Sequence, residues 1–431
     1  MKRYALALAV LGLGACSDSG PTPPPPPPPP APITLTGLPA SGATLHQLEL
    51  TFTVVPNAAS TPGTFTITID GTPAATFGNQ YFGTFIVSSV PLANGVHTAH
   101  VVISPGSGGS GLDTTFSFTT EIDTKAYLST PLPPLAGYTA AVANDMNSAG
   151  VIVGASTAGN TQSQAVTWTN GVVAALPTTG GLQTTANAIN TQGDIAGSVN
   201  TDPPSAALWR PGDTLRVIGT VQYGERINDA GQVLLDIGRS YAPVALYDIG
   251  TGSTTDVWAN DSTNVGTSMA IDMNSSGQVL GYDQNLEGTS KPVVTSGLAL
   301  PTKLPQPNVV EPDSYLNRPV DLNDHGDILL DYNGWWVLGS GSATTFLNAY
   351  LGGAPGFPNY GARINNEGQV VALLNGKLYL WDKTTQMTQR IDAGASWTFD
   401  QITYFGDDGK ILVHGTDSES GTTAALLLTP Q

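Results

Sequence analysis

The stretch that decides the fold is residues 143–154, ANDMNSAGVIVG, because variants of it recur along the chain. ANAINTQGDIAG follows at 186–197, and shorter copies lie at 226–233, 272–279, 321–328 and 363–370. A seventh, degenerate copy covers 405–412. The copies share one glycine, which lies at positions 150, 193, 231, 277, 326, 368 and 409. Repeats spaced by 38 to 49 residues are typical of propellers and solenoids.

Each copy has the pattern of a β-hairpin. An apolar residue ends a strand, and an Asn such as Asn147 then opens a turn through a side-chain bond to the backbone. Three residues later the glycine adopts a left-handed conformation, and a second strand follows. Most copies continue with a third strand that carries an aromatic residue: Trp168, Trp209, Tyr247, Trp336 and Trp381. With a fourth strand before the next copy, each repeat predicts one propeller blade.

The two ends of the repeat region predict how the ring closes. Residues 424–428, AALLL, match a third strand, so the last repeat lacks its fourth strand. Residues 126–132, AYLSTPL, match a fourth strand but precede the first repeat. Pairing these segments would leave no open sheet edge. The sequence therefore predicts a seven-bladed β-propeller over residues 123–431 that is closed by an N-terminal strand.

The motif resembles the HAF repeats of bacterial extracellular proteins, in which alanine, an aliphatic residue, Asn, two variable residues and Gly precede a strand and then an aromatic strand. The resemblance covers roughly residues 127–431 and implies an extracellular repeat protein, but no particular activity. Two copies depart from the pattern. Pro292-Val293-Val294 replaces the aromatic strand of the fourth copy, and Gly406 replaces the turn Asn of the seventh.

Residues 33–122 have short runs of alternating apolar and polar residues separated by turn sequences such as Asp70-Gly71. About seven strands in roughly 90 residues predict an Ig-like β-sandwich. The segment LANGVHTAHVV at 92–102 resembles the late strands of bacterial Ig-like domains, which implies a spacer or adhesion module. The whole chain is therefore predicted to be all-β.

The amino terminus predicts export and lipidation. Residues 1–16 combine two cations, a short apolar run and a small-residue cleavage site, as signal peptides do. Residues 13–16, LGAC, resemble a lipobox, which implies that Cys16 carries a lipid. The proline-rich residues 17–32 favour a stiff polyproline spacer. We therefore expect a protein anchored through Cys16 to the bacterial envelope, at the outer membrane or the cell surface.

The charge restricts the partners. The chain has 33 acidic and 15 basic residues and a formal net charge of −18, which argues against nucleic acid as a partner. The partners that this charge leaves open are an extracellular glycan or an extracellular protein. We expect the protein itself to be a monomer. No P-loop, HExxH or G-x-S-x-G motif is present in the sequence.

One variable position of the innermost strands carries most of the charge that would line the channel. Two residues before the motif Asn stand Asp145, Ala188, Arg226, Asp272, Asp321 and Arg363, and the seventh copy has Tyr404 there. In one interpretation these residues bind a polar ligand, with the arginines holding a carboxylate or sulfate. In the other, which the sequence favours, neighbouring blades pair their charges, Arg226 with Asp272 and Asp321 with Arg363.

The fifth copy is the nearest approach to a calcium loop, with Asp321, Asn323 and Asp327. Because an Asn-to-Gly turn explains the same residues and the distal Glu is missing, we expect no cofactor. The sequence thus favours a surface-tethered, non-catalytic binding or interaction module for a glycan or protein. The alternative is a secreted carbohydrate-active hydrolase or lyase that uses channel carboxylates.

Overall fold

The computed structural model describes residues 34–36, 38–46, 50–55, 64–77, 83–87, 92–104, 111–159, 162–178, 182–201, 204–220, 223–236, 244–258, 267–284, 290–296, 302–304, 318–331, 334–339, 344–349, 361–385, 387–394 and 396–431. Every regular element among them is a β-strand. None of these residues belongs to a helix with the length and apolarity that membrane crossing requires. The predicted signal peptide, the lipobox with Cys16 and the proline-rich spacer lie outside the described residues.

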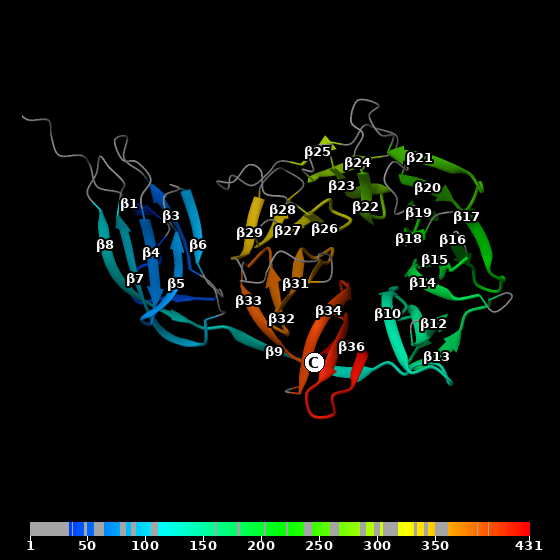
Figure 1. Ribbon diagram of the computed structural model, residues 1–431, viewed down its shortest axis with the longest axis horizontal. Helices are drawn as coiled ribbons and strands as arrows, with labels where there is room; N and C mark the ends of the chain where they lie inside the picture. Colours follow the sequence, from blue (N-terminus) through cyan, green and yellow to red (C-terminus); the bar gives the residue numbers. More distant parts are fainter. Residues whose placement is uncertain are drawn as a thin grey trace, which may run out of the picture.

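The amino-terminal part contains two sheets, seen in blue and cyan on the left of Figure 1. The first has the order β1-β3-β6 and the second β2-β8-β7-β4-β5. The strands are β1 (Thr34–Thr36), β2 (Ala43–Leu45), β3 (Leu50–Val55), β4 (Thr64–Ile69), β5 (Thr72–Phe77), β6 (Gly83–Val87), β7 (Gly95–Ser104) and β8 (Leu112–Thr120). Alternate residues of β4 and β7, among them Ile67 and Val101, are buried in one cluster, against which Leu35 of β1 packs. This alternation is the two-residue period of strands that have one buried face.

The repeat region forms antiparallel units of four strands that follow one another around an axis in chain order (Figure 1). Units 1 to 5 are separate sheets, β10–β13, β14–β17, β18–β21, β22–β25 and β26–β29, and unit 6 is β30–β33. Unit 7 is β34–β36 with β9 as its fourth strand. The described chain is therefore all-β and propeller-like.

The strands of the units have the following bounds: β9 (Asp123–Pro131), β10 (Ala140–Met146), β11 (Ile152–Ala158), β12 (Gln162–Thr169), β13 (Val172–Ala175), β14 (Thr184–Ile189), β15 (Ile195–Val199), β16 (Ser205–Trp209), β17 (Arg216–Thr220), β18 (Tyr223–Ile227), β19 (Gln232–Asp236), β20 (Val244–Asp248), β21 (Thr254–Trp258), β22 (Thr267–Met273), β23 (Gln278–Gln284), β24 (Ser290–Ser296), β25 (Thr302–Lys303), β26 (Arg318–Leu322), β27 (Ile328–Asp331), β28 (Gly334–Leu338), β29 (Thr344–Ala349), β30 (Ala362–Ile364), β31 (Gln369–Leu374), β32 (Lys377–Asp382), β33 (Thr388–Asp392), β34 (Trp397–Phe405), β35 (Ile411–Asp417) and β36 (Thr423–Pro430).

The motif turns have the predicted geometry. All seven motif glycines have a positive φ, between 74° and 84°, which residues with a β-carbon rarely adopt. In unit 1 the side-chain oxygen of Asn147 accepts hydrogen bonds from the backbone N–H groups of Ala149 and Val151 at 3.1 Å. The Asn of the first six motifs and the Gly of all seven thus turn the innermost strand into the second strand.

The predicted closing pair is present, with one addition. Strand β9 pairs antiparallel with β36 from Leu426↔Pro131 to Pro430↔Tyr127, as the sequence predicts for these segments. Its first half pairs in parallel with β33, from Gln389↔Asp123 to Asp392↔Ala126, which the repeat pattern does not indicate. Units 6 and 7 consequently belong to one eight-stranded sheet. Strand β9 also connects the ring to β8 through only two residues.

Apolar residues fill the space between successive units. One buried cluster combines Val153 of unit 1 with Ala186 and Trp209 of unit 2, and the next combines Leu208 of unit 2 with Val233 of unit 3. Four aromatic residues of the third strands belong to this packing: Trp168, Trp209, Tyr247 and Trp381. The indole N–H of Trp209 donates to the carbonyl of Pro177 at 2.7 Å, and Trp168 makes the equivalent bond to Pro133. Burying these rings with their N–H groups satisfied stabilises the contact between units.

Candidate functional site

A polar cavity of about 260 Å³ lies on the axis of the ring. Each of the seven innermost strands contributes residues to its wall. The lining includes all of the predicted channel residues: Asp145, Arg226, Asp272, Asp321, Arg363 and Tyr404. It also includes the turn residues Asn365, Asn366 and Asp407, so the cavity lies at the end of the channel that carries the Asn-to-Gly turns.

A β-bulge in the innermost strands determines which side chains reach this cavity. The pairing of β10 with β11 shifts between Ala143 and Asp145, and β14, β18, β22 and β26 shift at the equivalent place. A bulge inserts one extra residue and re-aims the side chains beside it. Two consecutive residues, Asn144 and Asp145, therefore both line the cavity, although strict alternation would turn them to opposite faces.

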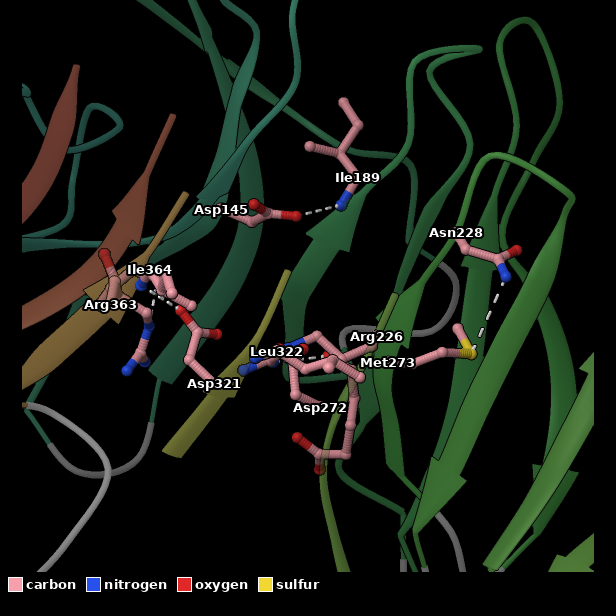
Figure 2. Close-up of polar contacts among 12 residues, drawn as sticks. Asp145, Ile189, Arg226, Asn228, Asp272, Met273, Asp321, Leu322, Arg363 and Ile364 are labelled. Atoms are coloured by element: carbon pink, nitrogen blue, oxygen red, sulfur yellow. Dashed lines mark hydrogen bonds and ion pairs between the residues drawn. The ribbon is translucent and has the colours of Figure 1, made fainter. Parts of the chain in front are cut away.

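The three channel aspartates are fixed by the following unit. Oδ2 of Asp145 accepts a hydrogen bond from the backbone N–H of Ile189 at 2.8 Å, as Figure 2 shows. Asp272 binds Leu322 N at 3.0 Å and Asp321 binds Ile364 N at 2.8 Å in the same way. Each carboxylate thus crosses from one innermost strand to the next.

The two channel arginines also contact the following unit. Arg226 Nε donates to Oδ1 of Asp272 at 3.1 Å, the ion pair that the sequence predicts. Arg363 Nε donates to the carbonyl of Thr403 at 3.3 Å, and its Nη1 donates to the carbonyl of Ala362. For the other predicted pair, the structure gives Asp321 a backbone partner, Ile364 N, one residue beyond Arg363. The three carboxylates at this position thus each reach a main-chain donor of the following unit.

Burial and mutual repulsion alter the protonation of the channel acids. Burial raises the pKa of Asp145 to about 6, although the Ile189 N–H and the charge of Arg226 oppose the shift. Burial and the neighbouring Asp272 raise the pKa of Asp321 well above its usual range, because two close carboxylates do not both ionise readily. Burial is the largest single influence on Arg226 and opposes its charged form, but the combined attraction of Asp272, Glu225, Asp145 and Asp321 outweighs it and raises the pKa of Arg226.

A ladder of asparagine amides lies beside the cavity and joins the turns. The Nδ2 group of each motif Asn donates to the main-chain carbonyl of the equivalent residue in the next unit. The bonds are Asn147 to Asn190 (3.1 Å), Asn190 to Asn228 (3.2 Å), Asn228 to Asn274 (3.5 Å), Asn274 to Asn323 (3.2 Å), Asn323 to Asn365 (3.0 Å) and Asn365 to Gly406 (3.3 Å). The motif Asn therefore joins neighbouring units as well as opening its own turn.

Unit 7 ends the ladder because Gly406 has no side chain to donate. A β-carbon at position 406 would lie 2.6 Å from the hydroxyl oxygen of Tyr404. The junction of unit 7 with unit 1 instead includes His414, whose Nε2 accepts a hydrogen bond from Ala143 N at 3.4 Å. Burial lowers the pKa of His414, which agrees with a neutral ring that accepts this bond.

The residues of the calcium hypothesis have other partners. Asp327 is buried and forms an ion pair with Lys383 at 2.7 Å, and its backbone N–H donates to Asn323 Oδ1. Asp321 instead faces the cavity and binds Ile364 N. Within the described ranges, no group of three or more His, Cys, Asp or Glu side chains is arranged to hold a metal ion.

Sequence reasoning missed two groups of cavity residues. Asn144 and Asn187 occupy the bulge position, and their Nδ2 groups donate to Ala186 O at 2.8 Å and Gly224 O at 3.0 Å. Asn366 lies on the rim, where its amide binds the carboxylates of Asp324 and Asp407 at 3.2 and 3.1 Å. The residue after the motif Asn is polar in six copies, and the residue after Gly406 in the seventh is also polar, so the sequence carries a signal for the rim.

No protein-family model and no curated protein matches the sequence. Among solved structures, the chain is similar to YCF48 from Cyanidioschyzon merolae (14% identity, 70% of this chain and 98% of that chain, TM-score 0.44). It is also similar to a gluconolactonase from Xanthomonas campestris (10%, 58% and 91%, 0.37) and to an auxiliary nutrient binding protein from Bacteroides thetaiotaomicron (11%, 93% and 98%, 0.35). At such low identities and TM-scores, the propeller-like fold rests on the strand order of the chain itself.

Proposed function

We propose that the chain is a surface-tethered, non-catalytic binding module that presents the turn-bearing end of a seven-bladed β-propeller to an extracellular glycan or protein. In this proposal the seven four-stranded units are the blades, and residues 33–122 are an Ig-like sandwich that serves as a spacer. Cys16 carries a lipid that anchors the protein to the bacterial envelope, at the outer membrane or the cell surface. The protein acts as a monomer of the HAF repeat type, without nucleic acid or a metal cofactor.

The observation that carries the proposal is the state of the polar groups in the cavity. Asp145, Asp272 and Asp321 each accept a backbone N–H from the next unit, and Arg226 is paired with Asp272. Side chains held in this way form a rigid polar surface, and a rigid surface loses little conformational entropy when a ligand binds. Polar groups that converge in a preformed cavity are the usual features of a binding site.

The binding proposal is tested with the full-length chain carrying Cys16→Ser, screened against immobilised glycans and envelope proteins. Asn187→Arg places a longer, charged side chain at the wall of the cavity, whereas Ala175→Arg places the same side chain on the exposed β13. We expect binding by the parent and by Ala175→Arg, and its loss in Asn187→Arg. Equal binding by all three chains would place the interface away from the channel, and the absence of any retained ligand would contradict the binding function.

The anchoring part of the proposal has its own test. The chain expressed in a bacterium that processes lipoproteins is expected to incorporate labelled palmitate and to fractionate with membranes. Cys16→Ser should abolish both. Incorporation of label by Cys16→Ser, or an unlabelled parent chain in the soluble fraction, would contradict lipidation at Cys16.

The raised pKa values of two channel acids favour a second candidate, a carbohydrate-active hydrolase or lyase. Burial raises the pKa of Asp145 to about 6, and burial together with the neighbouring Asp272 raises the pKa of Asp321 further. Both acids therefore hold protons at a higher pH than ordinary carboxyls do. Release of reducing ends or of unsaturated products from bound oligosaccharides would support catalysis. If Asp145→Asn and Asp321→Asn lose that turnover but still bind the oligosaccharide, the result would favour catalysis over a non-catalytic binding function.

A further inference from the structure

The two-residue connector between β8 and β9 is bonded to the amino-terminal sheets through all of its main-chain polar groups. Glu121 N donates to the carbonyl of Leu45 at 2.9 Å, and the Glu121 carbonyl accepts a hydrogen bond from Nδ1 of His46 at 2.9 Å. Ile122 N donates to Oδ1 of Asn94 at 2.7 Å, and the Ile122 carbonyl accepts from Nδ2 of the same side chain at 3.0 Å. Because each residue has one main-chain donor and one acceptor, the connector cannot swing without breaking one of these bonds.

The same connector contacts unit 6 of the ring. The side chain of Ile122 is buried in one apolar cluster with Leu374 of β31, against which Tyr379 of β32 packs. The carbonyl of His46 accepts a hydrogen bond from the backbone N–H of Thr388 in β33 at 3.1 Å. Strand β9 then runs into the ring beside β33, as Figure 1 shows. The bonds of the connector therefore determine how the amino-terminal sheets are oriented relative to the ring.

A buried histidine supports the Asn94 side of this connector. The side chain of His97 is 10% exposed, and its Nδ1 lies 2.7 Å from Oδ2 of Asp70. Its Nε2 lies 2.8 Å from the carbonyl of Ala93, which also accepts a hydrogen bond from Oγ1 of Thr120. A carboxylate and a carbonyl only accept hydrogen bonds, so both ring nitrogens of His97 have to donate. Only the protonated ring has two N–H groups.

The surroundings of His97 contain one other titratable group. Asp70 follows β4, and its hydrogen bond with His97 lowers the pKa of Asp70, so that it is a carboxylate in mildly acidic solution. From β8, the ring of Phe118 lies 5.5 Å from the His97 ring, measured between centroids. His100 of β7 belongs to the opposite face of that strand and pairs with Asp113. Among the described contacts of His97, Asp70 is therefore the only charged partner.

Loss of one proton from His97 to solvent removes one of its two hydrogen bonds. Nδ1 keeps its proton beside the negative Asp70, so Nε2 then presents a lone pair to the carbonyl of Ala93. Two acceptors at 2.8 Å repel each other, and displacement of the Ala93 peptide relieves the repulsion. Asn94 is the next residue, so this displacement also moves the side chain that binds Ile122.

The other histidine at the connector does not respond in this way. Nδ1 of His46 has one acceptor, the carbonyl of Glu121, and an N–H at Nδ1 can donate to it whether the ring is neutral or charged. The sensitivity to protonation therefore belongs to His97.

We propose that the connector is a pH-sensitive lock, in which protonated His97 holds the amino-terminal sheets and the ring in one orientation and its deprotonation releases Ile122 from Asn94. Histidine ordinarily changes charge between pH 5 and 8. Because the bonds favour the protonated ring, the lock is present at the acidic end of this range and is lost as pH rises. The inference goes beyond the proposed binding function and does not depend on it.

The test is a distance measurement on the Cys16→Ser chain, which then contains no cysteine. Spin labels at the exposed positions Thr64→Cys and Thr384→Cys report on β4 and unit 6, and a second pair, Thr255→Cys with Thr384→Cys, reports on the ring alone. Pulsed electron spin resonance at pH 5 and pH 8 gives the distance distributions. For the first pair we expect a distribution at least about twofold broader at pH 8, as a released hinge allows. The second pair should not change, and Asn94→Ala should broaden the first pair at both pH values.

His97→Gln and the matched control His100→Gln identify the group that titrates. Both substitutions remove a histidine of β7 that pairs with an aspartate, but His100 is 43% exposed and faces away from the connector. His97→Gln should give the same width at both pH values, and His100→Gln should behave as the parent does. Asp70→Asn, which removes the charge that favours protonated His97, should move the broadening to lower pH. A thermal melt verifies that each variant is folded, and Asp70→Asn replaces His97→Gln if the latter is not.

Three results would overturn the inference. Equal widths in the parent at pH 5 and pH 8 would show that the connector does not respond to protonation. A pH response that persists unchanged in His97→Gln, or in Asp70→Asn, would assign it to another group. A narrow distribution in Asn94→Ala would show that the bonds to Ile122 do not set the orientation. Each of these results leaves the binding function standing, since no ligand takes part in the measurement.

Discussion

The hydroxyl of Tyr404 lies where the side chain of residue 406 would begin, 2.6 Å from the position of a β-carbon on Gly406. In each of the other six units, an Asn at the position of Gly406 donates its amide N–H to a main-chain carbonyl in the turn of the next unit. Tyr404 and Gly406 together therefore mark the one break in this ladder of asparagine amides. The break lies at the junction between unit 7 and unit 1, the two ends of the repeat region. There β36 pairs with β9, and His414 contacts Ala143.

Gly406→Asn alone should therefore destabilise the protein, by about 1–3 kcal/mol, because the new side chain overlaps the Tyr404 hydroxyl. Tyr404→Ala should make space for it, so the double variant should be more stable than the sum of the two single changes predicts. Chemical denaturation of the four chains gives the coupling energy. Additive effects would show that Tyr404 does not occupy the Asn position.

The ladder should depend on amide nitrogens. Asn274→Asp keeps the acceptor for Gln278 N but removes the Nδ2 donor to Asn323 O, and it brings a buried carboxylate close to that carbonyl. We expect a loss of about 2–3 kcal/mol in unfolding free energy at pH 7, smaller at pH 4, where the new acid is partly protonated. Ser275→Asp, on the exposed neighbouring residue, is the control. A loss for Asn274→Asp no larger than for the control would contradict a stabilising ladder.

Asp145 should make stability depend on pH in a defined direction. Its folded pKa of about 6 lies above the usual value, so the folded state binds the proton more tightly than the unfolded state. The contribution is present below about pH 4 and is lost as pH rises through about 6. Asp145→Asn should stabilise the protein relative to the parent by about 1–2 kcal/mol at pH 7, and by less at pH 4. An equal effect at both pH values, from melts in matched ionic strength, would rule out the shift.

The ion pair of Lys383 with the buried Asp327 predicts the response to calcium. Because Lys383 Nζ already lies 2.7 Å from Asp327 Oδ1, millimolar calcium and EDTA should leave the same Tm. Lys383→Met should cost about 3 kcal/mol, since it leaves an uncompensated buried charge, and adding Asp327→Asn should recover most of this loss. A Tm that rises with calcium in the parent chain would show that the fifth turn binds the ion after all.

The sequence alone determined the period of the repeat, the Asn-to-Gly turns, the strands that follow them and the pairing of 126–132 with 424–428. These features are local or repeated, and each glycine and Asn has a physical reason that does not depend on the rest of the chain. The same regularity located the channel position of Asp145, Arg226 and Asp272, because a residue at a fixed distance from a turn falls at an equivalent place in every unit.

Only the tertiary structure decided what those side chains contact. The bulge that turns Asn144 and Asn187 into the cavity depends on the register of a neighbouring strand, which has no simple motif. The partner of each channel carboxylate is a backbone N–H in the next unit, some forty to fifty residues away, and main-chain donors leave no mark in the sequence. Which polar groups of the channel meet one another is decided only when the units stand around one axis.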